Sequence, residues 1–191
     1  MDGLTFTSNM ISTLAWPITV IILFFILRSE LPNIAKSIKK FKYKDVELEF
    51  GAAVKAVAKE AKGSLPPSKS NVIAGKTTED IKTRLDAVAE LAPRAAILES
   101  WIQVEAAAAD VIQKKGLVSS VRYPGPTRLL TALKNEGILN GKQTLIFEQL
   151  RMLRNEAVHV HDAEFTVAAV ASYIESAILI ASYLEDIANG L

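Results

Sequence analysis

The sequence predicts an all-α protein with a single N-terminal transmembrane helix followed by a helical bundle. Two observations lead to this prediction. The 25 residues from Gly3 to Leu27 carry no charge, and several later stretches repeat apolar residues three or four positions apart, which is the period of an amphipathic helix. With 191 residues, 50% of them hydrophobic, the chain can form one domain of ordinary size and an accessory segment.

Residues 1–30 are expected to form the transmembrane anchor, with residues 10–27 inside the bilayer. About 20 helical residues, each rising about 1.5 Å, cross the roughly 30 Å hydrocarbon core. A cleaved signal peptide is the alternative, but the leader carries Asp2 and no lysine or arginine, and no small-residue cleavage site follows the apolar run. Pro17 lies within this run, where it kinks the helix or marks its ordered start.

Residues 31–62 are expected to form a basic juxtamembrane helical segment. No lysine or arginine precedes the span and several follow it, so the positive-inside rule places the N-terminus outside and the C-terminal domain in the cytoplasm. We therefore expect a single-pass protein of the inner membrane. The lysines are expected to bind anionic lipid head groups, with nucleic acid as the alternative partner. They are Lys36, Lys39, Lys40, Lys42 and Lys44.

Residues 63–77 are predicted to be a linker that lets the C-terminal domain stand away from the membrane. Paired prolines, serines and a glycine interrupt the Ala- and Lys-rich stretch that precedes them. Before that stretch, residues 46–50 alternate briefly between polar and apolar side chains. So short a pattern is compatible with a strand or with a helix.

Residues 78–191 are predicted to form the bundle, whose helices are separated by capping and turn residues. Thr77 with Asp80 marks one helix start, and Pro93 begins the next helix. A lysine pair and a glycine end that helix, and a proline-rich turn precedes a short one. The predicted helix ends lie near Thr77, Pro93, Lys115, Gly137, Lys142, His159, Phe165 and Ile187.

The last predicted helix has two interpretations. From Phe165 to Leu184 it carries only Glu175 as a charge, so it is either a buried helix of the bundle or a second membrane span. Alanine and serine dilute its apolar character, and a central glutamate is costly in hydrocarbon. We therefore favour the buried helix.

The helix predicted from Lys142 to His159 has two stripes of side chains. Asn140 followed by Gln143 is a capping pattern that marks its start. An apolar stripe with helical spacing is expected to face the core, and it consists of Ile146, Leu150, Leu153 and Ala157. A mixed stripe on another side is expected to be an interface or a site, and it consists of Leu145, Glu148, Met152, Asn155 and His159.

The end of this helix resembles the R-x4-H motif of the HEPN superfamily, which consists of helical domains. The motif residues are Arg154, Asn155 and His159, and the preceding Leu150–Leu153 stretch is similar to the flank of HEPN-like bacterial domains of unknown function. Upstream, the stretch from Pro93 to Glu105 resembles the first long helix of that group. The resemblance covers roughly residues 78–191.

This resemblance implies a metal-independent endoribonuclease of toxin or phage-defence type that acts on RNA as a homodimer. By this analogy His159 exchanges protons with the attacking 2′-hydroxyl or the leaving oxygen, Arg154 stabilises charge on the phosphate, and Asn155 orients the site. The alternative is a non-catalytic HEPN-like scaffold or RNA-binding module. In that case Arg154 is expected to form a structural ion pair with Glu105, and His159 to cap its helix.

Other chemistry has little support in the sequence. The chain has no cysteine, which excludes disulfides and thiolate chemistry, and its net charge of +1 indicates no particular partner. His159 and His161 lack the spacing and the additional ligands of a zinc site. No phosphate-binding loop, serine hydrolase elbow or dinucleotide-binding glycine pattern occurs. We therefore expect neither a metal nor a cofactor.

Overall fold

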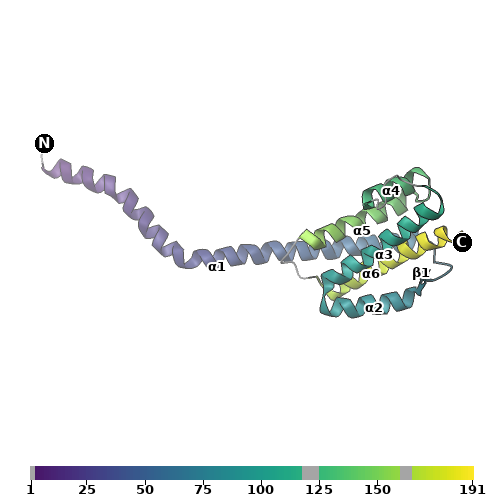
Figure 1. Ribbon diagram of the computed structural model, residues 1–191. Coiled ribbons are helices and arrows are strands. Elements are labelled where there is room, and N and C mark those ends of the chain that lie inside the picture. The colour runs from purple at the N-terminus through teal and green to yellow at the C-terminus, as the bar shows by residue number, and fades with distance from the viewer. Residues whose placement is uncertain (1–2, 118–124, 160–164) are drawn as a thin grey trace. The chain divides into compact units, whose positions relative to one another are not determined.

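The computed structural model describes residues 3–117, 125–159 and 165–191, and it confirms that the protein is mostly helical (Figure 1). The proline-rich turn expected at Tyr123–Pro126 lies partly outside these ranges, and the tight connection expected from Val160 to Asp162 lies wholly outside them. The described helices are α1 (Gly3–Ser64), α2 (Thr78–Leu91), α3 (Pro93–Lys114), α4 (Pro126–Asn135), α5 (Gly141–His159) and α6 (Val167–Ala188). Two short antiparallel strands, β1 (Val72–Ile73) and β2 (Lys76–Thr77), form a hairpin between α1 and α2.

The chain divides into two compact units, Met1–Lys44 and Asp45–Leu191, and α1 contributes to both. Residues 46–50, which the sequence left open, belong to this helix. In the first unit, the apolar side chains described between Met10 and Phe25 are all exposed, and Trp16 reaches 72% exposure. Residues Thr13–Phe25 form an apolar helical stretch of this unit.

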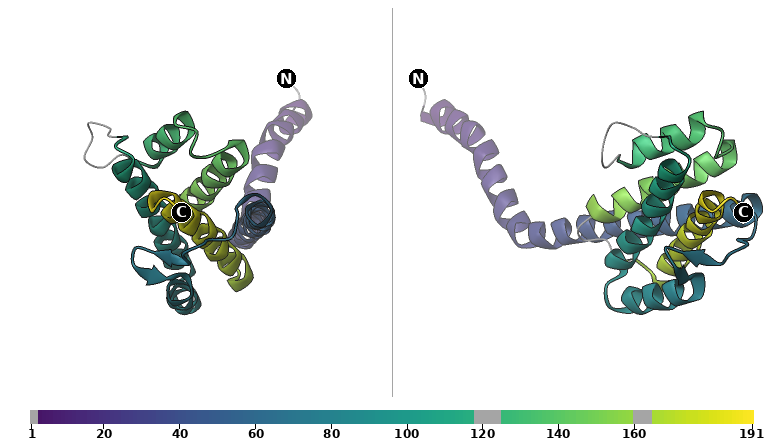
Figure 2. Two further views of the ribbon diagram at one scale, coloured as in Figure 1. Left: turned by 90° about the vertical axis from the view of Figure 1, so that its right-hand side faces the viewer. Right: turned by 45° about the vertical axis from the view of Figure 1, so that its right-hand side comes forward.

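The core of the second unit is built around α6. This helix contacts α2, α3, α5 and β1, and the end-on view of Figure 2 shows it among the surrounding helices. Within the described part of the chain, α6 is the one helix long and apolar enough to cross a membrane, but 61% of its apolar window is buried inside the protein. Its burial supports the interpretation of a bundle helix. The fully buried residues of α6 include Tyr173, Ile174, Ala177, Ile180, Ala181 and Leu184.

The second half of α1 belongs to the bundle, which differs from the expected juxtamembrane segment 31–62. The boundary between the two units falls after Lys44. Beyond it, four apolar residues with helical spacing are at most 2% exposed, and the ring of Phe50 lies 4.6 Å from that of Phe165. The sequence does not reveal this stripe as core, because alanine and lysine surround its valines and favour a helix whether or not one side is buried. It consists of Phe50, Val54, Val57 and Ala61.

The segment 63–77 is folded onto the bundle, which contradicts its assignment as a linker. Leu65 and Ile73 are buried at 7% and 0% exposure. Ala74 and Gly75 both have positive φ angles, of 48° and 76°, as required in the tightest hairpin turns. The glycines, prolines and serines that suggested flexibility therefore serve a tight turn and a packed loop.

Several predicted helix boundaries are confirmed. The Thr77 side chain accepts a hydrogen bond from the Asp80 amide at 3.1 Å, which caps α2 as expected. α3 begins at Pro93 and ends at Lys114, and Gly116 follows with a φ of 67°. α6 begins at Val167, two residues later than predicted, because Thr166 caps it.

Candidate functional site

The N-terminus of α5 is fixed by a reciprocal pair of hydrogen bonds, as the sequence predicts. The Gln143 amide donates to Asn140 Oδ1 at 3.0 Å, and the Asn140 amide donates to Gln143 Oε1 at 3.0 Å. Two N–H groups that lack partners in an isolated helix are thereby satisfied.

The two stripes of α5 lie where the sequence places them. The four residues of the core stripe are at most 5% exposed. On the other side, Leu145 and Met152 are 50% and 51% exposed, His159 is exposed, and Glu148 and Asn155 are half-buried. We call this set of five residues the outer stripe. Phe147, which the sequence analysis did not single out, is fully buried and packs its ring 5.1 Å from that of Trp101 on α3.

Arg154 is held by its neighbour in the motif. Its Nη1 donates to Asn155 Oδ1 at 3.0 Å, and its Nε is buried without a hydrogen-bond partner among the described residues. No ion pair between Arg154 and Glu105 occurs in the described part of the chain, so the expected structural pair is wrong. The two side chains were placed together by helical-wheel position, which does not determine the direction a long side chain takes.

A buried tyrosine on α6 supports the turn of α5 that carries Arg154. The Tyr173 hydroxyl donates to the Leu150 carbonyl at 3.1 Å, and in a regular helix the same carbonyl accepts from the Arg154 amide. Burial raises the pKa of Tyr173 strongly; the Arg154 charge opposes this shift and the Glu105 charge adds to it. The phenol therefore stays protonated and remains a donor. This contact could not be predicted from the sequence, because Tyr173 has the spacing of any other core residue of its helix.

Arg154 and His159 diverge on a single α5. They are five residues apart, which at about 100° per residue turns them roughly 140° around the helix. Asn155 and His159 are four residues apart and share a side. His159 is the last residue of α5 and is exposed. One copy of α5 thus brings Arg154 to Asn155 and leaves His159 one turn away, on the outer stripe.

An acidic side chain, Glu156, lies between Asn155 and His159 in the chain. Glu156 borders a cavity of about 310 Å³ between α1 and α5, to which Met152 and Ala56 also contribute. Burial first, and then the negative charge of Glu49, raise the pKa of Glu156. Sequence reasoning missed this pairing because Glu49 is more than 100 residues away along the chain.

The side chains that could hold a metal are dispersed. Among the described residues, no group of three or more histidine and acidic side chains is close enough to bind an ion. His161 lies outside the described residues.

Comparison with protein-family models, curated proteins and solved structures finds no match for this chain.

Chemically, the end of α5 offers a fixed cation and an exposed imidazole. Arg154 uses only Nη1 to bind Asn155, so other N–H groups of its guanidinium remain able to donate to an oxyanion. His159 is accessible to an incoming molecule. Arg154 and His159 point from different sides of α5, so a phosphate that contacts both would have to reach more than one side of the helix.

Proposed function

We propose that the chain is a membrane-anchored HEPN-like protein whose C-terminal helical domain is a metal-independent endoribonuclease of toxin or phage-defence type. One observation carries the proposal: the last turns of α5 hold the Arg154–Asn155 pair and, one turn further on, the exposed His159, in the order of the HEPN motif. RNA is the substrate in this proposal. Arg154 stabilises the phosphate, and His159 transfers the proton.

The divergence of Arg154 and His159 supports action as a homodimer. Two copies of α5 that face each other along the outer stripe would supply the second side of the site. A two-fold interface of this kind pairs the same patch on each copy. Leu145 and Met152 provide the exposed apolar surface that such a contact needs.

Membrane attachment in this proposal uses residues 10–27. The exposed apolar side chains of the first unit, among them Trp16, Phe24 and Phe25, are the observation that favours it. The basic residues that follow place the N-terminus outside the inner membrane and the catalytic domain in the cytoplasm. Lys36, Lys39, Lys40, Lys42 and Lys44 would bind anionic lipid head groups in this arrangement.

A non-catalytic scaffold or RNA-binding module is the second candidate. It is favoured by the same divergence, since within one copy the motif arginine is half-buried and bonded to Asn155 while His159 stands apart. In that case Arg154 would serve α5 itself and not a substrate.

The test compares wild type with His159→Ala and Arg154→Ala. His161→Ala is the matched control, since the chain has only two histidines. With chelator present, the wild type should cleave RNA and arrest growth on overexpression. His159→Ala should lose about 10²- to 10⁴-fold in rate, as expected for a general acid–base group, with unchanged thermal stability. Carbonate-washed membranes should retain the full chain and release a variant without residues 1–27.

The outcomes separate the two candidates. If wild type leaves varied RNAs intact and Arg154→Ala mainly lowers stability, the scaffold is correct. If His161→Ala loses as much activity as His159→Ala, the motif assignment is wrong. Release of the full chain by carbonate would remove the anchor from the proposal.

A further inference from the structure

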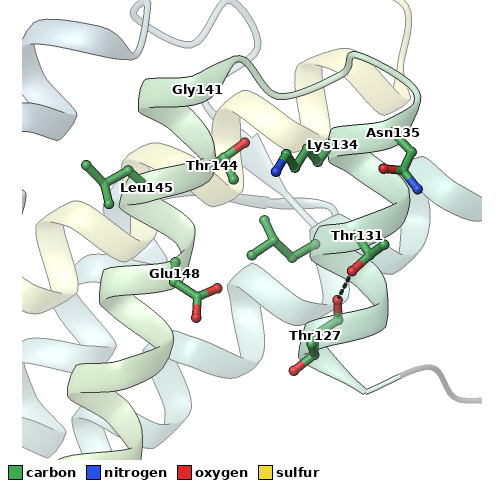
Figure 3. Close-up of a pocket in the computed structure, with 9 residues that line it drawn as sticks. Thr127, Thr131, Lys134, Asn135, Gly141, Thr144, Leu145 and Glu148 are labelled. Carbon is green, nitrogen blue, oxygen red and sulfur yellow. Dashed lines mark hydrogen bonds between the residues drawn. The ribbon is translucent and has the colours of Figure 1, made fainter.

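A cavity of about 440 Å³ lies between α4 and the first turns of α5, at the opposite end of α5 from the motif (Figure 3). Its volume falls within the range of about 300–1,000 Å³ that is typical of small-molecule sites. The lining residues that matter chemically are Leu130, Thr131, Lys134, Thr144, Leu145 and Glu148. A small set of polar groups above apolar side chains is the usual composition of such a site.

The cation of the cavity has no partner in the described part of the chain. The ammonium group of Lys134 takes part in none of the ion pairs or side-chain hydrogen bonds found there, and its backbone carbonyl accepts from the Gly137 amide. Figure 3 shows the Lys134 side chain reaching across the cavity from α4 toward Thr144 on α5. An unpaired ammonium group beside a cavity matches a ligand with one anionic group.

Thr144 provides the second observation. Its hydroxyl oxygen is buried and has no hydrogen-bond partner among the described groups. A buried hydroxyl without a partner destabilises a protein, so its retention needs a reason. Figure 3 shows Thr144 near the end of the Lys134 side chain, so a ligand oxygen bound by Lys134 would supply the missing partner once the Thr144 side chain turns toward it.

Each of the two helices also offers an acceptor, Thr131 on α4 and Glu148 on α5. Glu148 uses its Oε1 to accept from Arg151, so its second oxygen remains available, and Figure 3 shows the carboxylate pointing from α5 into the space beside α4. Thr131 donates to the Thr127 carbonyl at 2.8 Å, and its oxygen can still accept a hydrogen bond. Hydroxyl groups on a ligand would bind these acceptors, and its C–H groups would rest on Leu130.

We propose that this cavity binds a small hydroxylated anion, a sugar phosphate or a sugar acid, with its anionic group on Lys134 and Thr144 and its hydroxyls on Glu148 and Thr131. None of these four residues belongs to the Arg154–Asn155–His159 motif, although Glu148 and the lining residue Leu145 also belong to the outer stripe. On α5, Thr144 and Glu148 lie 15 and 11 residues before His159, which corresponds to roughly 22 and 16 Å along the helix.

Isothermal titration of the full chain in detergent tests the proposal with four probes: ribose 5-phosphate, gluconate, neutral ribose and inorganic phosphate. The two hydroxylated anions should bind, and ribose and inorganic phosphate should bind at least tenfold more weakly. Lys134→Ala should lower the affinity about tenfold to a hundredfold, as expected for a charge-assisted hydrogen bond. Lys115→Ala, at an exposed lysine directly after α3, is the matched control and should leave the affinity unchanged.

Thr144→Val separates a ligand role from a structural one. It keeps the shape and removes the unpartnered hydroxyl, so affinity should fall while the thermal stability of the ligand-free chain stays equal or rises. The proposal is overturned if neither hydroxylated anion binds at millimolar concentration, or if Lys134→Ala and Lys115→Ala bind equally. Inorganic phosphate that binds as tightly as ribose 5-phosphate would also overturn it.

Discussion

Asp186 fixes the segment before the β-hairpin to the central helix. At 6% exposure it accepts hydrogen bonds from the Lys69 amide at 2.7 Å, the Ser70 amide at 3.2 Å and the Ser70 hydroxyl at 2.5 Å. Burial works to raise the pKa of Asp186, but the hydrogen bonds from Ser70, Lys69 and Ser68 outweigh it, and the pKa is lowered. The ionised carboxylate therefore stabilises the fold.

Replacing Asp186 by asparagine should remove this stabilisation and its pH dependence. Because the pKa is lower in the folded state than in the unfolded state, the contribution is fully present above about pH 4 and is lost as the pH falls further. We expect Asp186→Asn to lower the free energy of unfolding by about 1.5–3 kcal/mol at pH 7, and by much less at pH 2–3. Urea unfolding at several pH values measures this.

Asp110→Asn is the control for that experiment. Asp110 pairs with Lys114 one turn away on the surface of α3, and such pairs contribute about 0–1 kcal/mol. If both variants lower the free energy of unfolding by the same amount at pH 7, the hydrogen bonds of Asp186 to Lys69 and Ser70 are not the cause of the loss.

At the scale of a helix, the start of α5 depends on one side chain. Asn140 both caps the Gln143 amide and receives the Gln143 side chain on its own amide. Since α5 carries the motif at its far end, its first turn sets the register of every residue on the outer stripe.

Asn140→Ala should lower the free energy of unfolding by about 1 kcal/mol, within the usual range of about 0.5–2 for a lost N-cap. The midpoint of thermal unfolding, followed by circular dichroism, should fall by about 2–4 °C. Asn135→Ala is the matched control, because Asn135 is exposed at the C-terminal end of α4 and its side chain makes no hydrogen bond in the described part of the chain. Equal losses in both variants would argue against the cap.

At the scale of the whole molecule, the folded domain begins at Asp45 and not at residue 78. The α1 stripe from Phe50 to Ala61 completes the core, and Leu65 and Ile73 follow it into the interior. Each large apolar residue removed from a core costs about 2–5 kcal/mol. Total stabilities are only about 5–15 kcal/mol, so the loss of several exceeds what the remaining helices can offset.

A fragment of residues 45–191 should therefore fold alone, with a cooperative thermal transition. A fragment of residues 78–191 should lack that transition and bind a hydrophobic dye, because the apolar surface that the α1 stripe covers would be exposed. Circular dichroism and dye fluorescence on the two fragments decide the matter. Cooperative unfolding of the shorter fragment would show that α1 is dispensable for the core.

Self-association through the outer stripe can be measured on the longer fragment. We expect light scattering to detect a dimer of residues 45–191, and Leu145→Glu or Met152→Glu to dissociate it by placing like charges across the two-fold axis. Ile102→Glu, at a site of similar exposure (52%) on α3, should leave the dimer intact. A fragment that is monomeric at high concentration would remove the two-copy site, unless the span itself drives pairing.

What the sequence determined by itself is the local part of the fold. The helical period, the Asn140–Gln143 and Thr77–Asp80 caps, and the buried and outer stripes of α5 all follow from neighbours within four positions along the chain. The HEPN resemblance, the RNA substrate, the dimer and the anchor stay predictions. Only the tertiary structure decided whether a segment with a given local pattern lies in the core, in a loop or at the surface, because that depends on groups far away in the sequence.

The α1 stripe became core because Phe165 and the bundle cover it. The apparent linker became a packed loop because Asp186, more than 100 residues later, binds its amides. Arg154 turned to Asn155 and not to Glu105. Apolar composition suits a membrane span and a bundle core equally well, so α6 could be assigned to the core only from the helices packed around it.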